Sequence, residues 1–251
     1  MIEFRGRGIL LDIEGTTSSV RFVYDVMFPF VRRELDKYLH AHWGEAALMS
    51  ACDQIAHDAG QGSLHEWVAH NTAGSTSKEK ELGLALVRGE VQRLMDGDVK
   101  ATGLKQLQGL IWESGFHSGE MTAHLYEDVA PEIARWHEAG MDVRIFSSGS
   151  VQAQRLFFGH TKVGNLLPKF RGHYDTTTGS KKEPASYTKI AAEFALPAFD
   201  ILFVSDIVGE LDAARLAGMQ TALSVRPENA EVPPRHGHRT IASFAEIVLV
   251  K

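Results

Sequence analysis

The chain has 251 residues, 44% of them hydrophobic, which is enough apolar material for a sizeable core in one large domain or two smaller ones. Its formal net charge of −6 and the lack of a long basic run argue against a nucleic-acid partner. Cys52 is the only cysteine, so an internal disulfide is excluded, and no uncharged stretch approaches the roughly 18 residues of a membrane span. With no room for a signal peptide before the first strand, we expect a cytoplasmic protein.

The first predicted strand ends in two acidic residues. Residues 8–11 form a short apolar run, which is followed by Asp12, Ile13, Glu14 and Gly15. Such a run is typical of a strand buried on both faces of a parallel sheet, and ligands bind at the carboxyl ends of such strands. The spacing of Asp12 and Glu14 places both side chains on one side of an extended chain, so one carboxylate can attack while the other moves a proton.

From residue 18 to residue 125 the pattern is helical, with no convincing strand. Apolar residues at helical spacing predict three long helices, over residues 24–41, 75–95 and 104–111. We expect Ser or Thr within 75–77 to cap the second helix, and Ser114–Gly115 to end the third. Residues 53–63 are polar and glycine-rich and predict a loop, although 51–59 could instead be helical.

From residue 131 strands and helices alternate, which is typical of an α/β fold with a doubly wound parallel sheet. The strands expected here are 142–146, 200–204 and 221–225, and the helices are 131–139, 151–158, 183–194 and 211–217. We therefore expect a Rossmann-like catalytic core made of residues 1–17 and 126–251. An all-helical cap, residues 18–125, would be inserted after the first strand.

Chemically distinctive side chains follow the predicted strands. They are Asp12 and Glu14, Ser147 and Ser148, Lys181, and Asp206. Because the carboxyl ends of parallel strands meet at one edge of the sheet, we expect these side chains to form a single ligand site. The set suits phosphoryl transfer through a covalent aspartyl-phosphate.

Each residue type has a part in that chemistry. Asp12 would attack phosphorus, while Glu14 would protonate the leaving oxygen and then deprotonate the attacking water. Ser147 or Ser148, at a helix N-terminus, would hold phosphoryl oxygens, and Lys181 would neutralise phosphate charge.

Asp206, the acidic residue that follows a later predicted strand, indicates a metal site. Asp206 with Asp12 would hold Mg²⁺, which prefers carboxylates and waters and can bridge to phosphate. Glu210 could assist Asp206 through the water shell of the metal, or merely begin a helix, where acidic residues are favoured.

Taken singly, these features also have structural explanations. Residues 147–150 could be a turn that caps the next helix, Lys181–Lys182 could be a solvated pair, and Asp206 could be an ordinary turn residue. Their joint order, with each feature after a predicted strand, favours the functional interpretation.

The four motifs are similar to those of the haloacid dehalogenase superfamily of phosphatases. The matching residues are Asp12-Ile13-Glu14-Gly15-Thr16, Ser147, Lys181 and Ser205-Asp206. Within that superfamily the chain resembles the enolase-phosphatase family of methionine salvage, in residues 12–23, 147–154 and 225–230. Most superfamily phosphatases carry Asp two places after the nucleophile. Glu14 departs from them but agrees with this family.

The resemblance implies a bifunctional, Mg²⁺-dependent enzyme, monomeric and with one Mg²⁺ per monomer. It would enolise 2,3-diketo-5-methylthiopentyl-1-phosphate and then remove phosphate to give the acireductone. In the family's terms Asp12 is the nucleophile and a metal ligand, and Asp206 is a metal ligand. Glu14 is the acid/base residue and meets the metal through its backbone carbonyl. The substrate-binding residues are Ser147, Ser148 and Lys181.

Other functions on the same fold stay open. They are another small-metabolite phosphatase of the superfamily, a metal-independent 2-haloacid dehalogenase, and a non-catalytic phosphate-binding module. A metal-independent dehalogenase would have no use for Glu14 and Asp206 together. The intact motif residues argue against a non-catalytic binding module. The core motifs handle phosphate generically, so we expect an apolar segment beside the nucleophile loop, Phe22 and Tyr24 foremost, to contact the methylthio tail.

Overall fold

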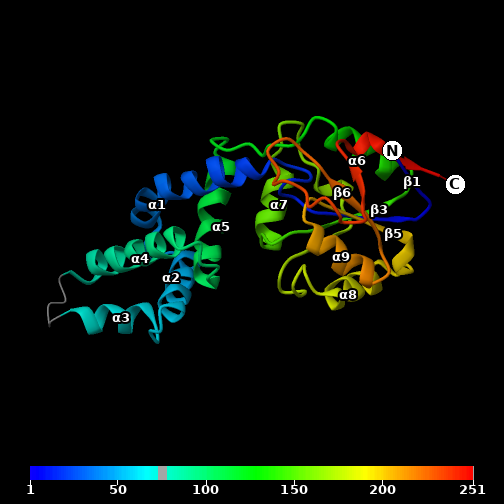
Figure 1. The fold of residues 1–251 in the computed structure, drawn as a ribbon. Coiled ribbons are helices and arrows are strands. Elements are labelled where there is room, and N and C mark those ends of the chain that lie inside the picture. The colour runs from blue at the N-terminus through cyan, green and yellow to red at the C-terminus, as the bar shows by residue number, and fades with distance from the viewer. Residues whose placement is uncertain (73–77, 251) are drawn as a thin grey trace. The chain divides into compact units, whose positions relative to one another are not determined.

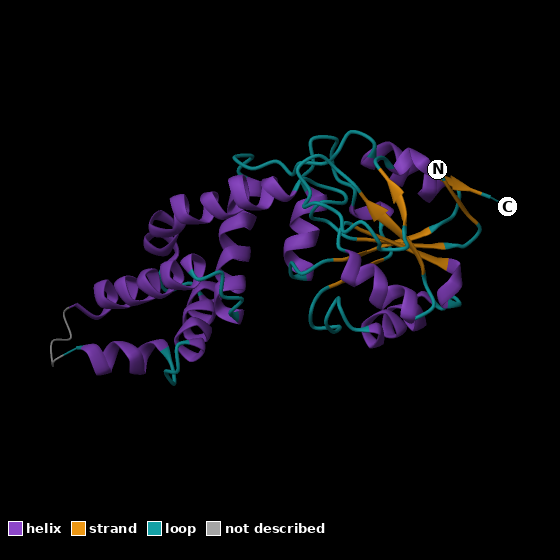
Figure 2. Cartoon of the chain, viewed as in Figure 1, coloured by secondary structure: helices purple, strands orange, loops and turns teal. Residues whose placement is uncertain are grey.

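The computed structural model describes residues 1–72 and 78–250 and divides them into two compact units (Figure 1). The first unit is made of Met1–Asp25 and the chain from Thr122 onward, and the second is Val26–Met121. All the strands described belong to the first unit, and the described part of the second is built of helices and loops (Figure 2). No described helix is both long and apolar enough to cross a membrane.

The centre of the first unit is a six-stranded parallel sheet with the strand order β4-β3-β2-β5-β6-β7. Its strands are β2 (Gly8–Leu11), β3 (Asp142–Phe146), β4 (Gly172–Tyr174), β5 (Ile201–Ser205), β6 (Gln220–Ser224) and β7 (Arg239–Ile241). The order passes from the middle to one edge, returns to the middle and then passes to the other edge. This is the doubly wound Rossmann arrangement. The predicted fold class, with helices inserted after the first strand of this sheet, is confirmed.

Strand β2 lies in the middle because it is apolar on both faces. Ile9, Leu10 and Leu11 are fully buried. Four helices flank the sheet, namely α6 (Val129–Glu138), α7 (Val151–Gly159), α8 (Pro184–Phe194) and α9 (Val208–Leu216). Leu10 shares a hydrophobic core with residues of α8 and α9, and strand alternation turns Ile9 and Leu11 to the opposite face. Figure 1 shows α8 and α9 on one side of the sheet and α6 on the other.

A second, two-stranded sheet was not predicted. Strand β1 (Ile2–Phe4) pairs in parallel with β8 (Ile247–Leu249). Val250 N–H extends this pairing by donating to the Phe4 carbonyl at 2.9 Å. Strands of three residues carry too little periodicity to be found from the sequence.

The second unit is a set of helices that follows a π-helical turn at Phe22–Met27. The helices are α1 (Phe28–His42), α2 (Ala46–Asp58), α3 (Leu64–Asn71), α4 (Glu79–Asp96) and α5 (Thr102–His117). Close packing fixes α2 against α5, because a Cβ atom on Gly103 would lie 2.4 Å from the Ile55 backbone nitrogen. Cys52 lies in α2 and is fully buried.

Three predictions for this unit need correction. The loop predicted from residue 53 is wrong as far as Asp58, because α2 continues there, as the helical alternative allowed. Helix α3 was missed. Helix α5 continues past Gly115, where the lack of a side chain admits the Phe30 ring, so this glycine serves packing and does not end the helix. The predicted cap at 75–77 lies outside the described residues.

Candidate active site

The site begins where three neighbouring strands end together. Leu11 of β2 pairs with Ile145 of β3 and with Val204 of β5, so these strands finish at the same edge of the sheet. The residues directly after them are Asp12, Ser147 and Asp206. Lys181, on the loop that follows β4, reaches the same place. The structure thus gathers the predicted site residues at the carboxyl edge of the sheet.

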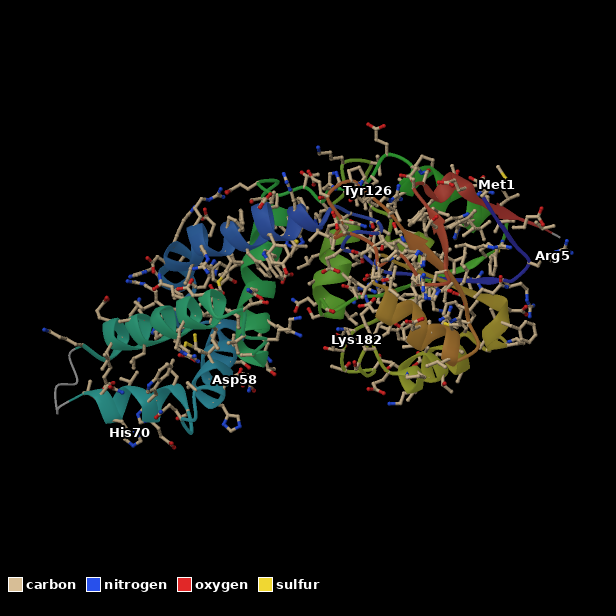
Figure 3. The ribbon with its side chains drawn as sticks, viewed as in Figure 1. Met1, Arg5, Asp58, His70, Tyr126 and Lys182 are labelled. Carbon is tan, nitrogen blue, oxygen red and sulfur yellow. The ribbon has the colours of Figure 1, made fainter. Side chains whose placement is uncertain are left out.

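Lys181 is held by two carboxylates. Its Nζ atom lies 2.6 Å from Asp12 Oδ1 and 2.7 Å from Glu210 Oε2, and the side chain is only 6% exposed. Burial acts to lower the pKa of the ammonium, but the two carboxylates outweigh it and raise that pKa. The cation therefore stays charged. Its neighbour Lys182 is exposed on the surface (Figure 3).

Glu210 is the principal site residue whose contacts the sequence did not predict. It lies in the first turn of α9 and is buried, so it does begin a helix, but that is not its whole role. Neither alternative included its ion pair with Lys181. Ser205 Oγ lies 2.9 Å from Glu210 Oε2 and 3.2 Å from Asp12 Oδ2. Burial, and next the charge of Asp12, raise the pKa of Glu210 to about 7.

Glu14 points to the strand end of β3. Its Oε2 atom accepts a hydrogen bond from Ser147 Oγ at 3.1 Å. Burial and the nearby Asp12 carboxylate raise the pKa of Glu14, and Lys181 opposes them. Ser147 is fully buried, and Ser148 beside it is half-buried. A different residue caps the following helix, because Ser150 Oγ accepts from the backbone of α7.

Asp206 lies against a glycine that no other residue could replace without strain. Gly15 has a φ of +69°, and a Cβ atom there would lie 2.3 Å from Asp206 Oδ2. Asn229 fixes the same turn by donating from Nδ2 to the Gly15 carbonyl at 2.9 Å. Burial, followed by repulsion from Asp12 and Glu210, raises the pKa of Asp206 to about 7.

The site holds more carboxylates than cations. We call Asp12, Glu14, Asp206 and Glu210 the acidic cluster, and Lys181 is the cation paired with it. Within residues 1–72 and 78–250, no three acidic, His or Cys side chains converge as a ready-made metal ligand group. Asp12 and Asp206 nevertheless offer hard oxygen donors, and the repulsion that raises the pKa of Asp206 would be relieved by a divalent cation.

A buried arginine ties the loop that follows β2, residues 12–17, to the rest of the unit; we call this segment the nucleophile loop after the predicted role of Asp12. Arg226 donates to both carboxylate oxygens of Asp128, at 2.9 and 2.8 Å, and its Nε donates to the Thr16 carbonyl at 3.3 Å. The guanidinium also lies 4.6 Å from the centre of the Tyr126 ring. The segment 225–230 carried part of the family resemblance, and this network gives that segment a physical role.

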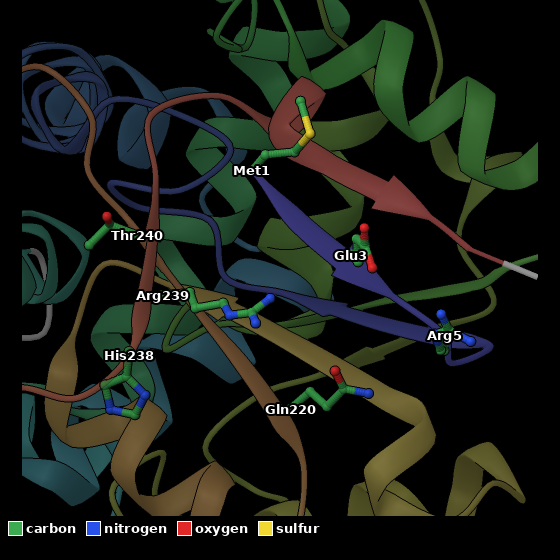
Figure 4. Close-up of a pocket in the computed structure, with 7 residues that line it drawn as sticks. All are labelled: Met1, Glu3, Arg5, Gln220, His238, Arg239 and Thr240. Carbon is green, nitrogen blue, oxygen red and sulfur yellow. The ribbon is translucent and has the colours of Figure 1, made fainter.

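A large surface pocket lies elsewhere. It has a volume of about 810 Å³ and is lined by Arg5 of the β1 loop, by Gln220 and by Arg239 among others (Figure 4). Gln220 and Arg239 begin β6 and β7, so the pocket is at the amino edge of the sheet. It contains none of the predicted site residues.

Comparison with known proteins agrees with this geometry. Residues 7–218 match the family of haloacid dehalogenase-like hydrolases. The chain is 40% identical to "Enolase-phosphatase E1" of Pseudomonas aeruginosa, over 97% of this chain and 98% of the relative. It is 43% identical to the protein of that name from Methylococcus capsulatus, over 90% and 91%. The crystal structure of the UTR4 protein of Saccharomyces cerevisiae is similar, with a TM-score of 0.70 and 29% identity over 96% of this chain and 99% of that one.

These relatives confirm the resemblance read from the motifs. Coverage is nearly complete on both sides of each comparison, so the likeness extends through the inserted helices as well as the sheet. The chain belongs to the haloacid dehalogenase-like hydrolases and, within them, to the enolase-phosphatase E1 family.

Proposed function

We propose that this chain converts 2,3-diketo-5-methylthiopentyl-1-phosphate to the acireductone and phosphate, by enolisation and then hydrolysis, in methionine salvage. Identity of 40–43% to proteins named enolase-phosphatase E1 supports the proposal. The observation that carries it is the placement of two carboxylates at one strand end. Asp12 is paired with Lys181 at 2.6 Å, and Glu14 is bonded to Ser147 at 3.1 Å.

Asp12 is the proposed nucleophile. Its carboxylate oxygen attacks phosphorus, which forms an aspartyl-phosphate and breaks the bond to the leaving oxygen. Glu14 protonates that oxygen, and its raised pKa favours the protonated form that this requires. As a carboxylate, Glu14 then takes a proton from the water that attacks the phosphoenzyme. Aspartate is regenerated and phosphate is released.

Ser147, Ser148 and Lys181 are the proposed phosphate-binding residues. The Ser147 hydroxyl and the backbone that follows it lead into the N-terminus of α7, where N–H groups favour an anion. Lys181 supplies a buried positive charge that the ion pairs with Asp12 and Glu210 hold in a fixed position.

We further propose that one Mg²⁺ binds each monomer through Asp12, Asp206 and the backbone carbonyl of Glu14. Bound there, it would neutralise the acidic cluster and the charge on the phosphoryl group. The Glu14 side chain remains available for proton transfer, because its hydrogen bond is directed to Ser147.

The two parts of the chain have different proposed tasks. The proposed catalytic core is residues 1–17 and 126–251, and the proposed cap that selects the substrate is residues 18–125. The compact units divide at slightly different points, since residues 18–25 and 122–125 belong to the first unit. Phe22 and Tyr24 are the proposed contacts for the methylthio tail. Phe22 is buried, and Tyr24 is 57% exposed. The protein is proposed to act in the cytoplasm as a monomer.

The test is to follow phosphate release and enol absorbance together on the diketone phosphate, for the wild type and for Asp12→Asn. We expect both signals from the wild type. Asp12→Asn should abolish phosphate release, since an amide cannot replace a carboxylate nucleophile, and should retain part of the enol signal. Phosphate release without enol formation would indicate a different phosphatase of the superfamily. Halide release from 2-haloacids in excess chelator would indicate the dehalogenase.

A further inference from the structure

The segment that leads from residue 122 to Asp128 is held against the nucleophile loop. Tyr126 N–H donates to the Thr17 carbonyl at 3.1 Å, and Ala123 N–H donates to the His160 carbonyl at 2.8 Å. Both ends of the segment are therefore fixed by backbone bonds. Figure 3 labels Tyr126 in the first unit. The segment carries two polar rings, His124 and Tyr126, that the steps described above do not use.

The hydrogen bonds of His124 define its tautomer. Its Nδ1 atom lies 3.3 Å from the backbone nitrogen of Ser19, which can only donate. Nδ1 is therefore an acceptor, and the neutral ring carries its proton on Nε2. Burial is the main reason that the pKa of His124 is lowered, and the charge of Lys162 acts in the same direction. At neutral pH His124 thus presents an uncharged Nε2–H donor.

Tyr126 supplies a second donor beside the first. The two ring centroids are 5.5 Å apart, with the rings nearly perpendicular. The Tyr126 hydroxyl is buried and makes no hydrogen bond of good geometry within the described residues. Burial is the main reason that the pKa of Tyr126 is raised. The Ser19 side chain is close enough to form a weak hydrogen bond that lowers this pKa, and the charge of Asp206 acts to raise it. The Arg226 guanidinium, which binds the Thr16 carbonyl, packs on the Tyr126 ring. A buried hydroxyl without a well-formed hydrogen bond is costly, and a bound ligand can supply the missing acceptor.

We propose that His124 and Tyr126 form a donor pair that binds the two adjacent carbonyl oxygens of a vicinal diketone and stabilises the oxygen that becomes negative during enolisation. This inference rests on the proposed function. The ligand class follows from the geometry, since two neighbouring uncharged donors fit two neighbouring acceptors. A neutral imidazole can also polarise a carbonyl, because it donates a hydrogen bond to the oxygen without transferring its proton.

The step balances without a co-reactant. A carboxylate of the acidic cluster takes a proton from the carbon that bears the phosphate. The C–H electron pair becomes the new C=C bond, and the π pair of the adjacent carbonyl moves to its oxygen, which accepts a hydrogen bond from one donor of the pair while the other donor holds the second carbonyl oxygen. The same carboxylate then returns the proton to the oxygen that received the π pair. The product is the enol, and both donors keep their own protons.

The experiment measures enolisation alone. A diketone phosphonate, in which carbon replaces the bridging ester oxygen, can be enolised but cannot be hydrolysed. Exchange of its C–H protons for deuterium in D₂O, followed by ¹H NMR, reports the step directly. We expect Tyr126→Phe and His124→Gln each to slow this exchange, by up to about 10²–10³-fold, as for other donors to a developing oxyanion. Hydrolysis of p-nitrophenyl phosphate, which needs no enolisation, should stay within about threefold of wild type.

The chain offers a matched control. Tyr38 and His42 of α1 also form a tyrosine–histidine pair, with ring centroids 4.2 Å apart. Tyr38→Phe and His42→Gln should leave both reactions unchanged. Exchange at the wild-type rate in Tyr126→Phe and His124→Gln would overturn the inference, and so would an equal loss of exchange and of p-nitrophenyl phosphate hydrolysis. Absence of exchange in the wild type itself would instead count against the proposed function.

Discussion

Glu210 Oε2 lies 2.7 Å from Lys181 Nζ, so the buried cation is shared between Glu210 and the proposed nucleophile. Without Glu210, Lys181 would pair with Asp12 alone and would be drawn from the phosphate toward the attacking oxygen. We therefore expect Glu210→Gln to lower kcat/KM for phosphate release by about 10–100-fold, as supporting residues around catalytic groups commonly do. Glu183→Gln, at an exposed position, is the control. Equal rates for the two variants would show that the pairing does not matter.

Lys181 and Lys182 are adjacent lysines, of which the first is buried and the second is exposed to solvent. Lys181 is 6% exposed and contacts two carboxylates, whereas Lys182 is exposed. Removing a buried donor aimed at the reacting group costs about 2.7–4 kcal/mol, or about 10²–10³ in rate. Lys181→Ala should show such a loss in steady-state phosphate release, and Lys182→Ala almost none. Similar losses in both variants would contradict the assignment.

The most accurate predictions were those for buried strands and for the site residues that directly follow them. Strand β3 has the predicted bounds, and β5 differs from its prediction by one residue at each end. Strand β5 is an apolar run that is buried throughout, and in β3 the apolar residues Val143, Ile145 and Phe146 are fully buried. Such buried apolar positions are a strong strand signal. Because parallel strands in register end together, the meeting of Asp12, Ser147 and Asp206 follows from the strand pattern alone.

Contacts made by packing between distant segments could not be predicted. The pairing of Glu210 with Lys181 depends on how α9 lies against the loop after β4, and no local pattern encodes that. The bond from Arg226 to Asp128 joins residues far apart in the chain. The prediction that Gly115 ends a helix was wrong for a related reason. The sequence does not distinguish a glycine that makes room for the Phe30 ring from one that ends a helix.

Metal removal should affect both activity and stability. Asp206 has its pKa raised to about 7 by burial and then by Asp12 and Glu210, so the acidic cluster is under repulsion without a cation. Chelator should stop phosphate release, and Mg²⁺ should restore it. Mg²⁺ should also raise the Tm of the wild type, because it binds only the folded state, and should raise that of Asp206→Asn much less. Potassium chloride at matched ionic strength is the control. Full activity in excess chelator would contradict the metal assignment.

A histidine in β4 makes stability depend on pH. Burial lowers the pKa of His173 to about 4, well below its ordinary value of 6.5. Between these values the unfolded chain binds more protons than the folded one, so the free energy of unfolding falls as pH drops from about 6.5 toward 4. We expect His173→Gln to show a smaller loss of stability between pH 7 and pH 5 than wild type, measured by urea unfolding. Parallel pH profiles would show that His173 does not contribute.

The last prediction concerns Arg226, whose fork binds both oxygens of Asp128 while its Nε binds the Thr16 carbonyl. Lysine keeps the charge but cannot make this set of bonds, so partly buried acceptors lose their donors. We expect Arg226→Lys to lower the free energy of unfolding by about 1–3 kcal/mol. Thr16 follows the turn that packs on Asp206, so the variant should also lower kcat for phosphate release under conditions where it remains folded.

Arg144→Lys is the matched control, because Arg144 also bonds both oxygens of one carboxylate, that of Asp142, at 2.9 and 2.8 Å. It packs on the Phe194 ring at 4.2 Å and has no bond to the nucleophile loop among those described for the chain. Both variants should therefore lose stability in urea unfolding, but only Arg226→Lys should lose kcat in the folded state. If the two variants lose activity only in proportion to the unfolded fraction, Arg226 stabilises the fold without positioning the loop. A selective loss of kcat in Arg226→Lys would mean that the bond to the Thr16 carbonyl holds the turn on which Asp206 rests.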